Sequence, residues 1–171
     1  TALYATGQVS GGTYVGGLIG LHSGGQFNNG YATGKVTATG DFVGGLIGLF
    51  EELGPSELGY VTASGNVRGA NQVGGLIGGV GSSSYSRVGN IYEAYASGNV
   101  SGANHVGGLV GELNSGAVSN AYSTGGVSGT DGVGGLVGYN QKNISLSYAS
   151  GAVTGTSNVG GLVGINPGGG T

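Results

Sequence analysis

The side chains that could support acid–base or metal chemistry are few in this chain and far apart. Histidine occurs only at His22 and His105, and neither has a partner at the spacing of a metal site. We therefore expect both imidazoles to be exposed in turns. The nucleophilic serine motif, the dinucleotide-binding glycine loop and the phosphate-binding loop are all absent, which counts against hydrolase and nucleotide-binding roles.

The sequence has one cluster of acidic residues, made of Glu51, Glu52 and Glu57 on either side of a Gly54-Pro55 turn. Such carboxylates could hold one calcium ion, but they also suit a solvated loop that keeps a weakly charged surface soluble. We favour the solvated loop and expect neither a metal nor another cofactor.

Asp41 and Asp131 occupy one recurring position, which we interpret as a turn. The equivalent residues are Thr13, Asp41, Asn71, Asn104, Asp131 and Ser157, so the acid does not repeat as it would in a calcium-binding array. A polysaccharide-cleaving β-helix would need several converging charged residues, and this activity is the least favoured alternative. We predict that the chain is not an enzyme.

Charged residues make up only 6% of the chain, and the net charge is -3. The basic residues are Lys35, Arg68, Arg87 and Lys142, each alone in the sequence. Because nucleic-acid binding needs clustered cations, we expect no nucleic-acid partner. Cysteine is absent, and no apolar run approaches the roughly 18 residues of a membrane helix, so we expect neither disulfides nor membrane insertion.

The dominant feature of the chain is a hexapeptide, Val-Gly-Gly-Leu-Ile/Val-Gly. It begins at Val15, Val43, Val73, Val106, Val133 and Val159. Successive copies start 26 to 33 residues apart, an interval typical of solenoids and other repeat arrays. Glycine supplies 45 residues, most of them at fixed repeat positions. One structural unit has therefore been copied along the whole chain.

Two further elements recur in each unit. Tyr-Ala-Thr/Ser-Gly-x-Val precedes the hexapeptide, as in Tyr4 to Val9, and its apolar and polar residues alternate as in a strand with one buried face. An apolar residue four positions before the tyrosine position, such as Phe27 or Ile91, indicates another strand. Three strands joined by Gly/Asn turns, in which Gly and Asn/Asp tolerate positive φ, fit one coil of a parallel β-helix.

We therefore predict an all-β, right-handed parallel β-solenoid of about six coils, each of 26–33 residues with three short strands. The coils lie near residues 1–27, 28–57, 58–90, 91–117, 118–143 and 144–171, in a single array over 1–171. No polar cap is evident at either end, which suggests a segment of a longer protein or a subunit that stacks end to end.

The pair Tyr-Ala-Thr-Gly-x-Val-Ser-Gly and Val-Gly-Gly-Leu-Val-Gly resembles the GLUG repeat, and the resemblance covers nearly the whole chain. That repeat occurs in large secreted or wall-anchored bacterial proteins, including immunoglobulin A1 metallopeptidases and haemagglutinin-like adhesins. The resemblance implies a surface context rather than an activity. The H-E-x-x-H motif of those peptidases is absent, so their catalysis does not carry over.

One candidate binding face is a tyrosine column, interrupted by Thr62 in the third coil. Its members are Tyr4, Tyr31, Tyr95, Tyr122 and Tyr148. Outward rings would form an aromatic stripe for sugars or a partner surface, whereas inward rings would cap the core. A Thr/Ser column beside it includes Thr6, Thr33, Ser97 and Thr124, and a flat face of this kind could also bind ice.

The hexapeptide poses a question of orientation, because Leu18 and Ile19 are adjacent and cannot both face inward on a straight strand. Either the two glycines bend the chain so that both enter the core, or one column is exposed and marks an association surface. The candidates for that surface are Leu18, Leu46, Leu76, Leu109, Leu136 and Leu162.

Together these features predict a non-catalytic extracellular module, secreted or at the cell surface. It would act as a stalk, an adhesin or a self-associating filament element, with itself or the flanking domains of a longer chain as partner. A carbohydrate- or ice-binding module, with surface glycans as one possible ligand, is the alternative. The insertions between hexapeptide and tyrosine, such as Ser82 to Tyr85, are further candidate contact loops.

Overall fold

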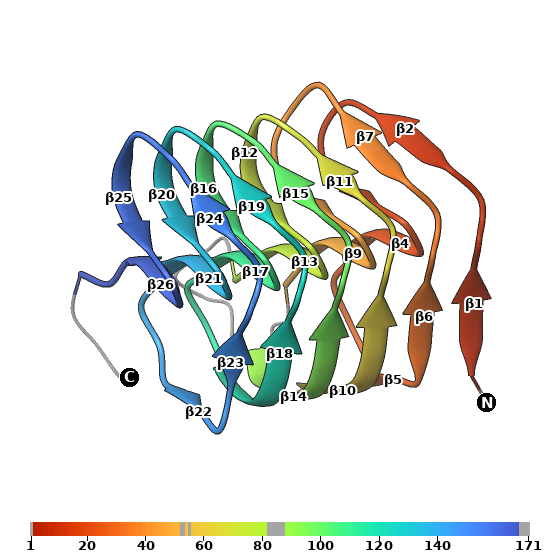
Figure 1. Ribbon diagram of the computed structural model, residues 1–171. Helices are drawn as coiled ribbons and strands as arrows, with labels where there is room; N and C mark the ends of the chain where they lie inside the picture. Colours follow the sequence, from red (N-terminus) through yellow and green to blue (C-terminus); the bar gives the residue numbers. More distant parts are fainter. Residues whose placement is uncertain (1, 52–53, 55, 82–87, 168–171) are drawn as a thin grey trace.

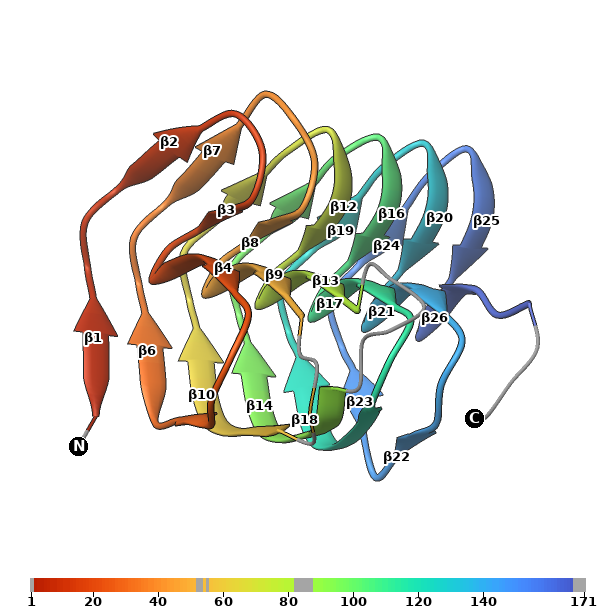
Figure 2. The same cartoon turned by 180° about the vertical axis from the view of Figure 1, so that it is seen from behind.

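The computed structural model describes residues 2–51, 54, 56–81 and 88–167, and every regular element in that part of the chain is a β-strand. All strand pairs are parallel, and each coil pairs with the next, so the predicted all-β solenoid of six coils is confirmed (Figure 1). The winding is right-handed, as the front and back views show (Figures 1 and 2). None of the described residues lies in a helix that could span a membrane.

Four parallel sheets run along the solenoid axis. Sheet A contains β1 (Leu3–Ala5), β6 (Gly30–Ala32), β10 (Ser56–Ala63), β14 (Val88–Ala96), β18 (Ala117–Ser123) and β22 (Ile144–Ser145), with β5 (Phe27–Asn28) paired to β10 and β23 (Tyr148–Ala149) paired to β18. Sheet B contains β2 (Val9–Gly11), β7 (Val36–Ala38), β11 (Val67–Arg68), β15 (Val100–Ser101), β19 (Val127–Ser128) and β24 (Val153–Thr154).

The hexapeptide supplies the other two sheets. Sheet C contains β3 (Val15–Gly16), β8 (Val43–Gly44), β12 (Asn71–Gly74), β16 (Asn104–Gly107), β20 (Asp131–Gly134) and β25 (Ser157–Gly160). Sheet D contains β4 (Ile19–His22), β9 (Ile47–Phe50), β13 (Ile77–Val80), β17 (Val110–Leu113), β21 (Val137–Asn140) and β26 (Val163–Ile165). One copy of the hexapeptide thus forms two short strands with a bend between them.

That bend turns both apolar residues of the hexapeptide into the core. The amides of Leu18 and Ile19 both donate to the carbonyl oxygen of Leu46 in the next coil, at 3.0 Å each, so the chain changes direction between them. In the second coil Leu46 and Ile47 are both fully buried. The first of the two predicted orientations therefore holds.

The leucine association surface considered above does not exist on this molecule. Leu46, Leu76, Leu109 and Leu136 are fully buried, Leu18 is half-buried against the core, and Leu162 in the last coil is 36% exposed. The leucine side chains follow the bend inward, because only there can they leave water. Lateral association through this column is ruled out by their burial.

The core is divided into two parts by a waist, which we define as the contact between the second glycine of the hexapeptide and the alanine of the Tyr-Ala-Thr/Ser-Gly element. A Cβ added at Gly45 would lie 2.9 Å from the Cβ of Ala63 and 2.1 Å from the carbonyl oxygen of Gly75 in the next coil. On one side of the waist sheets A and D enclose the larger core, which includes Phe50, Leu58 and Ile77, and on the other side sheets B and C enclose a valine core.

The coils also contain two recurring positions with a left-handed backbone, the first in all six coils and the second in the last five. The first precedes the hexapeptide valine and comprises Tyr14, Phe42, Gln72, His105 and Asn158, with Gly132 completing the column. The second lies in sheet A and comprises Asn29, Tyr60, Glu93, Asn120 and Leu146. Three of these residues are asparagines and one is Gly132, so most of the left-handed positions hold residues for which this conformation is strained. In-register pairing on both sides holds the conformation despite a cost of about 1 kcal/mol or more per residue.

Candidate functional site

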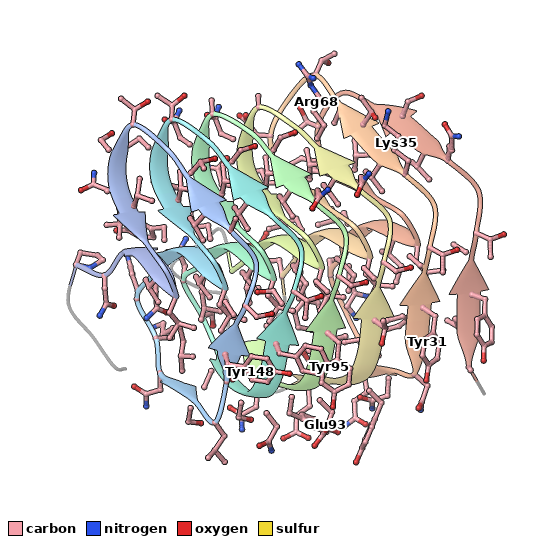
Figure 3. All side chains as sticks on the ribbon, in the orientation of Figure 1. Tyr31, Lys35, Arg68, Glu93, Tyr95 and Tyr148 are labelled. Atoms are coloured by element: carbon pink, nitrogen blue, oxygen red, sulfur yellow. The ribbon has the colours of Figure 1, made fainter. Side chains whose placement is uncertain are left out.

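The tyrosine column points outward from sheet A (Figure 3). In-register pairing aligns Tyr4 with Tyr31, and Tyr122 with both Tyr95 and Tyr148. The neighbouring residue of each coil, such as Ala32, faces the core instead. Of the two orientations that the sequence leaves open, the outward one is therefore correct. The rings at the two ends, Tyr4 and Tyr148, are 69% and 54% exposed.

The rings of the column stack on one another along the solenoid axis. Centroid distances are 5.1 Å for Tyr4 and Tyr31, 4.3 Å for Tyr95 and Tyr122, and 5.2 Å for Tyr122 and Tyr148. Because neighbouring faces cover each other, most of the column presents ring edges and hydroxyl groups to solvent. Stacking of a sugar on a ring face is thereby confined to the ends of the column and to the break at Thr62.

One hydroxyl of the column is tied to a carboxylate. Tyr95 donates a hydrogen bond to Glu93, which lies two residues earlier at one of the left-handed positions. This hydrogen bond, helped by partial burial and by the negative charge of Glu93, raises the pKa of Tyr95 to about 12. Tyr95 therefore stays neutral at physiological pH.

The Thr/Ser column lies beside the tyrosines, at the corner between sheets A and B. Thr6, Thr33, Ser97 and Thr124 are all exposed, as the alternation in the sequence predicts. The amide of Thr33 donates to the carbonyl oxygen of Ala5, and that of Thr124 donates to Ala96, so coil spacing fixes the separation of these hydroxyl groups.

A groove of about 480 Å³ runs along the outer face of sheet B. Its walls are two columns on either side of the buried valines: Asn66 and Asn99 belong to one column, and Arg68, Ser128 and Thr154 belong to the other. Its volume is within the range of ligand-binding pockets. The groove does not follow from the sequence, because its depth depends on the side chains of several coils together.

Lys35 and Arg68 both line this groove, although they stand alone in the sequence. Pairing of Val67 with Val36 places Arg68 one coil beyond Lys35 and two residues further along the strand, roughly 8 Å away from Cα to Cα. Figure 3 shows both residues at the same end of the molecule, on the upper part that sheet B forms. No described acidic residue lines the groove.

His105 has a partner that the sequence analysis missed. Its Nδ1 lies 3.3 Å from Oε2 of Glu112, and its ring stacks on Tyr139 with centroids 4.8 Å apart. Only a quarter of the His105 side chain is exposed, so the prediction of a turn-exposed imidazole was wrong for this residue. The signal was the seven-residue spacing from 105 to 112, which spans the hexapeptide bend and brings the outer faces of sheets C and D together.

Glu112 is held in its ionised form where the outer faces of sheets C and D meet. Burial opposes the charge, but hydrogen bonds from His105 and from Asn114, whose Nδ2 lies 2.6 Å from Oε1, lower the pKa of Glu112 below its usual value overall. The pair links sheets C and D from the outside. Among the described residues no three His, Asp or Glu side chains come together as a metal site, so we interpret this cluster as a structural contact.

The calcium hypothesis concerns a loop that the structure describes only in part. Glu51 is half-buried and Glu57 is exposed, whereas Glu52 lies outside the described residues. The residues from Ser82 to Tyr85, which are candidates for a contact loop, also lie outside them, as does Arg87. Asp41 and Asp131 belong to a ladder of polar side chains that are hydrogen-bonded from one coil to the next. Asp41 accepts a hydrogen bond from Nδ2 of Asn71 at 2.8 Å, and Asp131 accepts one from the hydroxyl of Ser157 at 2.7 Å.

Hydrogen bonds within this ladder also shift the pKa of Asp131. The hydrogen bonds from Ser157 and Asn158 lower the pKa of Asp131. The carboxylate of Asp131 is therefore hydrogen-bonded to the next coil. Asp131 links two coils in addition to its expected place in a turn.

Comparison with known proteins adds no homologue to this picture. No protein-family model matches the chain, and neither the curated proteins nor the solved structures give a match. The function therefore has to be argued from the surfaces described above.

Proposed function

We propose that this chain is a non-catalytic repeat module, secreted or displayed at a cell surface, that binds surface glycans through its lateral faces as an adhesin does. The observation that carries the proposal is the outward tyrosine stack on sheet A. The resemblance to the GLUG repeat supports the surface context, and the stack supports binding.

Several properties of the stack suit it to recognition. Tyrosine combines a large apolar ring with a polar hydroxyl, and it is enriched in energetically important contacts. Each ring is already held by its neighbours, with Tyr122 between Tyr95 and Tyr148, so little side-chain entropy is left to lose on binding. The phenol groups repeat at the coil spacing of about 4.8 Å, which suits a ligand that is itself a repeating polymer.

The first prediction tests this face. Replacing Tyr95, Tyr122 and Tyr148 with serine removes one block of the stack without touching the core, since their side chains point to solvent. We expect binding to a printed array of surface glycans to fall by at least tenfold, while the far-ultraviolet circular dichroism spectrum stays unchanged. Tyr139→Ser, which removes a half-buried tyrosine on sheet D, is the matched control and should bind normally.

Equal binding by the triple variant would show that the stack is not the recognition surface. If the array stayed blank for the wild type and the chain sedimented as a concentration-dependent multimer, the filament role would replace the adhesin role. Enrichment of the chain in growing ice with no glycan bound would instead favour the ice-binding alternative.

A further inference from the structure

We propose that the groove on sheet B binds an acidic polysaccharide, with the carboxylate or sulfate of the sugar held between Lys35 and Arg68. This inference deepens the proposed glycan-binding role and rests on it, but it concerns a different face from the tyrosine stack. Three features of the groove carry it: its unpaired cations, its free amide donors and its length along the axis.

The two cations are available for a ligand. Both side chains are exposed, and neither makes a hydrogen bond or ion pair with another described residue. The Cα atoms of the pair lie roughly 8 Å apart, a distance that two long side chains can close around one anionic group.

The asparagine wall supplies further donors. Oδ1 of Asn66 accepts from the amide of Asn99 at 2.9 Å, and Oδ1 of Asn99 accepts from the amide of Gly126 at 2.8 Å. These bonds use the acceptor atom of each side chain and fix its orientation. The Nδ2 groups have no partner among the described residues and remain as donors. The end of the groove near the cations is thus rich in donors, which suits a ligand rich in acceptors.

The other end of the groove is neutral and hydroxylated. Ser128 and Thr154 line it, and their hydroxyls lie 3.4 and 3.5 Å from the carbonyl oxygens of Val100 and Val127 in the preceding coil. From Lys35 to Thr154 the groove crosses four coil steps, about 19 Å. A short acidic oligosaccharide matches this gradient, because it combines an anionic group with a chain of hydroxyls.

The gradient also argues against a nucleic acid as the ligand. A polynucleotide carries one charge per nucleotide and needs cations along its whole length. Here the cations lie on two adjacent coils, and the groove beyond Arg68 is lined only by asparagine, serine, threonine, valine, glycine and alanine.

The test compares oligosaccharides of matched length by isothermal titration calorimetry: a galacturonate hexamer carrying carboxylates, a heparin hexasaccharide carrying sulfates, and neutral maltohexaose. We expect at least one acidic oligomer to bind at least tenfold more tightly than the neutral one, with an affinity that falls as salt is raised. Preference between the two acidic oligomers identifies the anion.

Variants locate the site. Lys35→Ala and Arg68→Ala should each weaken binding of the acidic oligomer by about tenfold, and the double variant should abolish it. Lys142→Ala removes the same charge from the turn between sheets D and A and serves as the matched control, for which we expect less than a twofold change. Thermal melting checks that each variant is folded, as expected because Lys35 and Arg68 are exposed and Lys142 is only half-buried.

Three outcomes would overturn the inference: no preference for acidic over neutral oligomers, equal weakening by Lys142→Ala, or binding of single-stranded DNA as tight as that of the best oligosaccharide. None of these outcomes bears on the tyrosine stack, which lies on a different face and is tested by its own serine variants. Those variants should not alter binding in this groove. Loss of all glycan binding in the array, in contrast, would contradict the proposed function itself.

Discussion

At the scale of single residues, the fold brings together pairs of side chains that show no relation in the sequence. Tyr95 is one of ten tyrosines, yet among the described residues it is the one member of the outward column that is hydrogen-bonded to a carboxylate, that of Glu93, which takes a left-handed backbone conformation two positions earlier. His105 and Glu112 meet in the same way across the hexapeptide bend. Neither pair stands out in the sequence, where no motif marks it.

The Tyr95 pair predicts a distinct titration. With its pKa raised to about 12 by Glu93, Tyr95 should ionise well above the ordinary tyrosine pKa of 10.0, and Glu93→Gln should return its pKa towards that value. Tyrosine labelled with carbon-13 at Cζ reports this by nuclear magnetic resonance, with Tyr95→Phe assigning the signal. A signal of Tyr95 that titrates identically in wild type and Glu93→Gln would contradict the contact.

The sign of the stability effect follows from the direction of the shift. Because the folded pKa lies above the unfolded value, the contribution of this bond is complete below pH 10.0 and disappears as the pH rises through about 12. Glu93→Gln should therefore lower stability near neutrality, where the bond contributes fully, without changing its pH dependence there, and should flatten the loss of stability between pH 10.0 and about 12.

At the scale of elements, the hexapeptide is explained by close backbone approach. Its second and third residues must be glycine because a Cβ has no space there: one added at Gly75 would lie 2.1 Å from the carbonyl oxygen of Gly108 in the next coil. The bend that these glycines permit puts leucine and isoleucine on the same side of the chain. This requirement for space, and not flexibility, accounts for the repeated glycines.

The last coil provides an internal control for this explanation. Gly161 occupies the repeat position of Gly75, but an added Cβ there has no atom within 4 Å. Gly75→Ala should lower the free energy of unfolding by about 3 kcal/mol or more, since rigid backbone atoms must move. Gly161→Ala should change it by less than about 1 kcal/mol. Urea denaturation measures both, and equal effects would show that the glycine is needed for some other reason.

At the scale of the whole molecule, stability passes from coil to coil. Each coil pairs only with its immediate neighbours, and the two cores are continuous stacks of like residues on either side of the waist. Such quasi-one-dimensional arrays can lose structure locally, unlike a domain with a single central core. The same continuity makes the lateral faces long and regular, which suits them to a polymeric ligand.

This architecture predicts a graded response to damage. In Gly75→Ala, amide hydrogen exchange should accelerate most in the third and fourth coils, which the clash joins, and least in the sixth. Mass spectrometry of peptides from each coil measures the gradient. A uniform increase in all six coils would instead show that the solenoid unfolds as one cooperative unit.

The sequence by itself determines the repeat, the parallel β-solenoid and its number of coils, because a hexapeptide copied at 26 to 33 residues must stack on its own copies to bury its apolar residues. It also places Tyr31 and its equivalents in one column. Only the tertiary structure decides how that column faces, where the bend buries Leu46, and that Lys35 and Arg68 share one groove. The physical reason is that sequence periodicity gives the order of side chains along a coil, whereas burial, groove depth and charge proximity depend on atoms of neighbouring coils that are about 30 residues away in the chain.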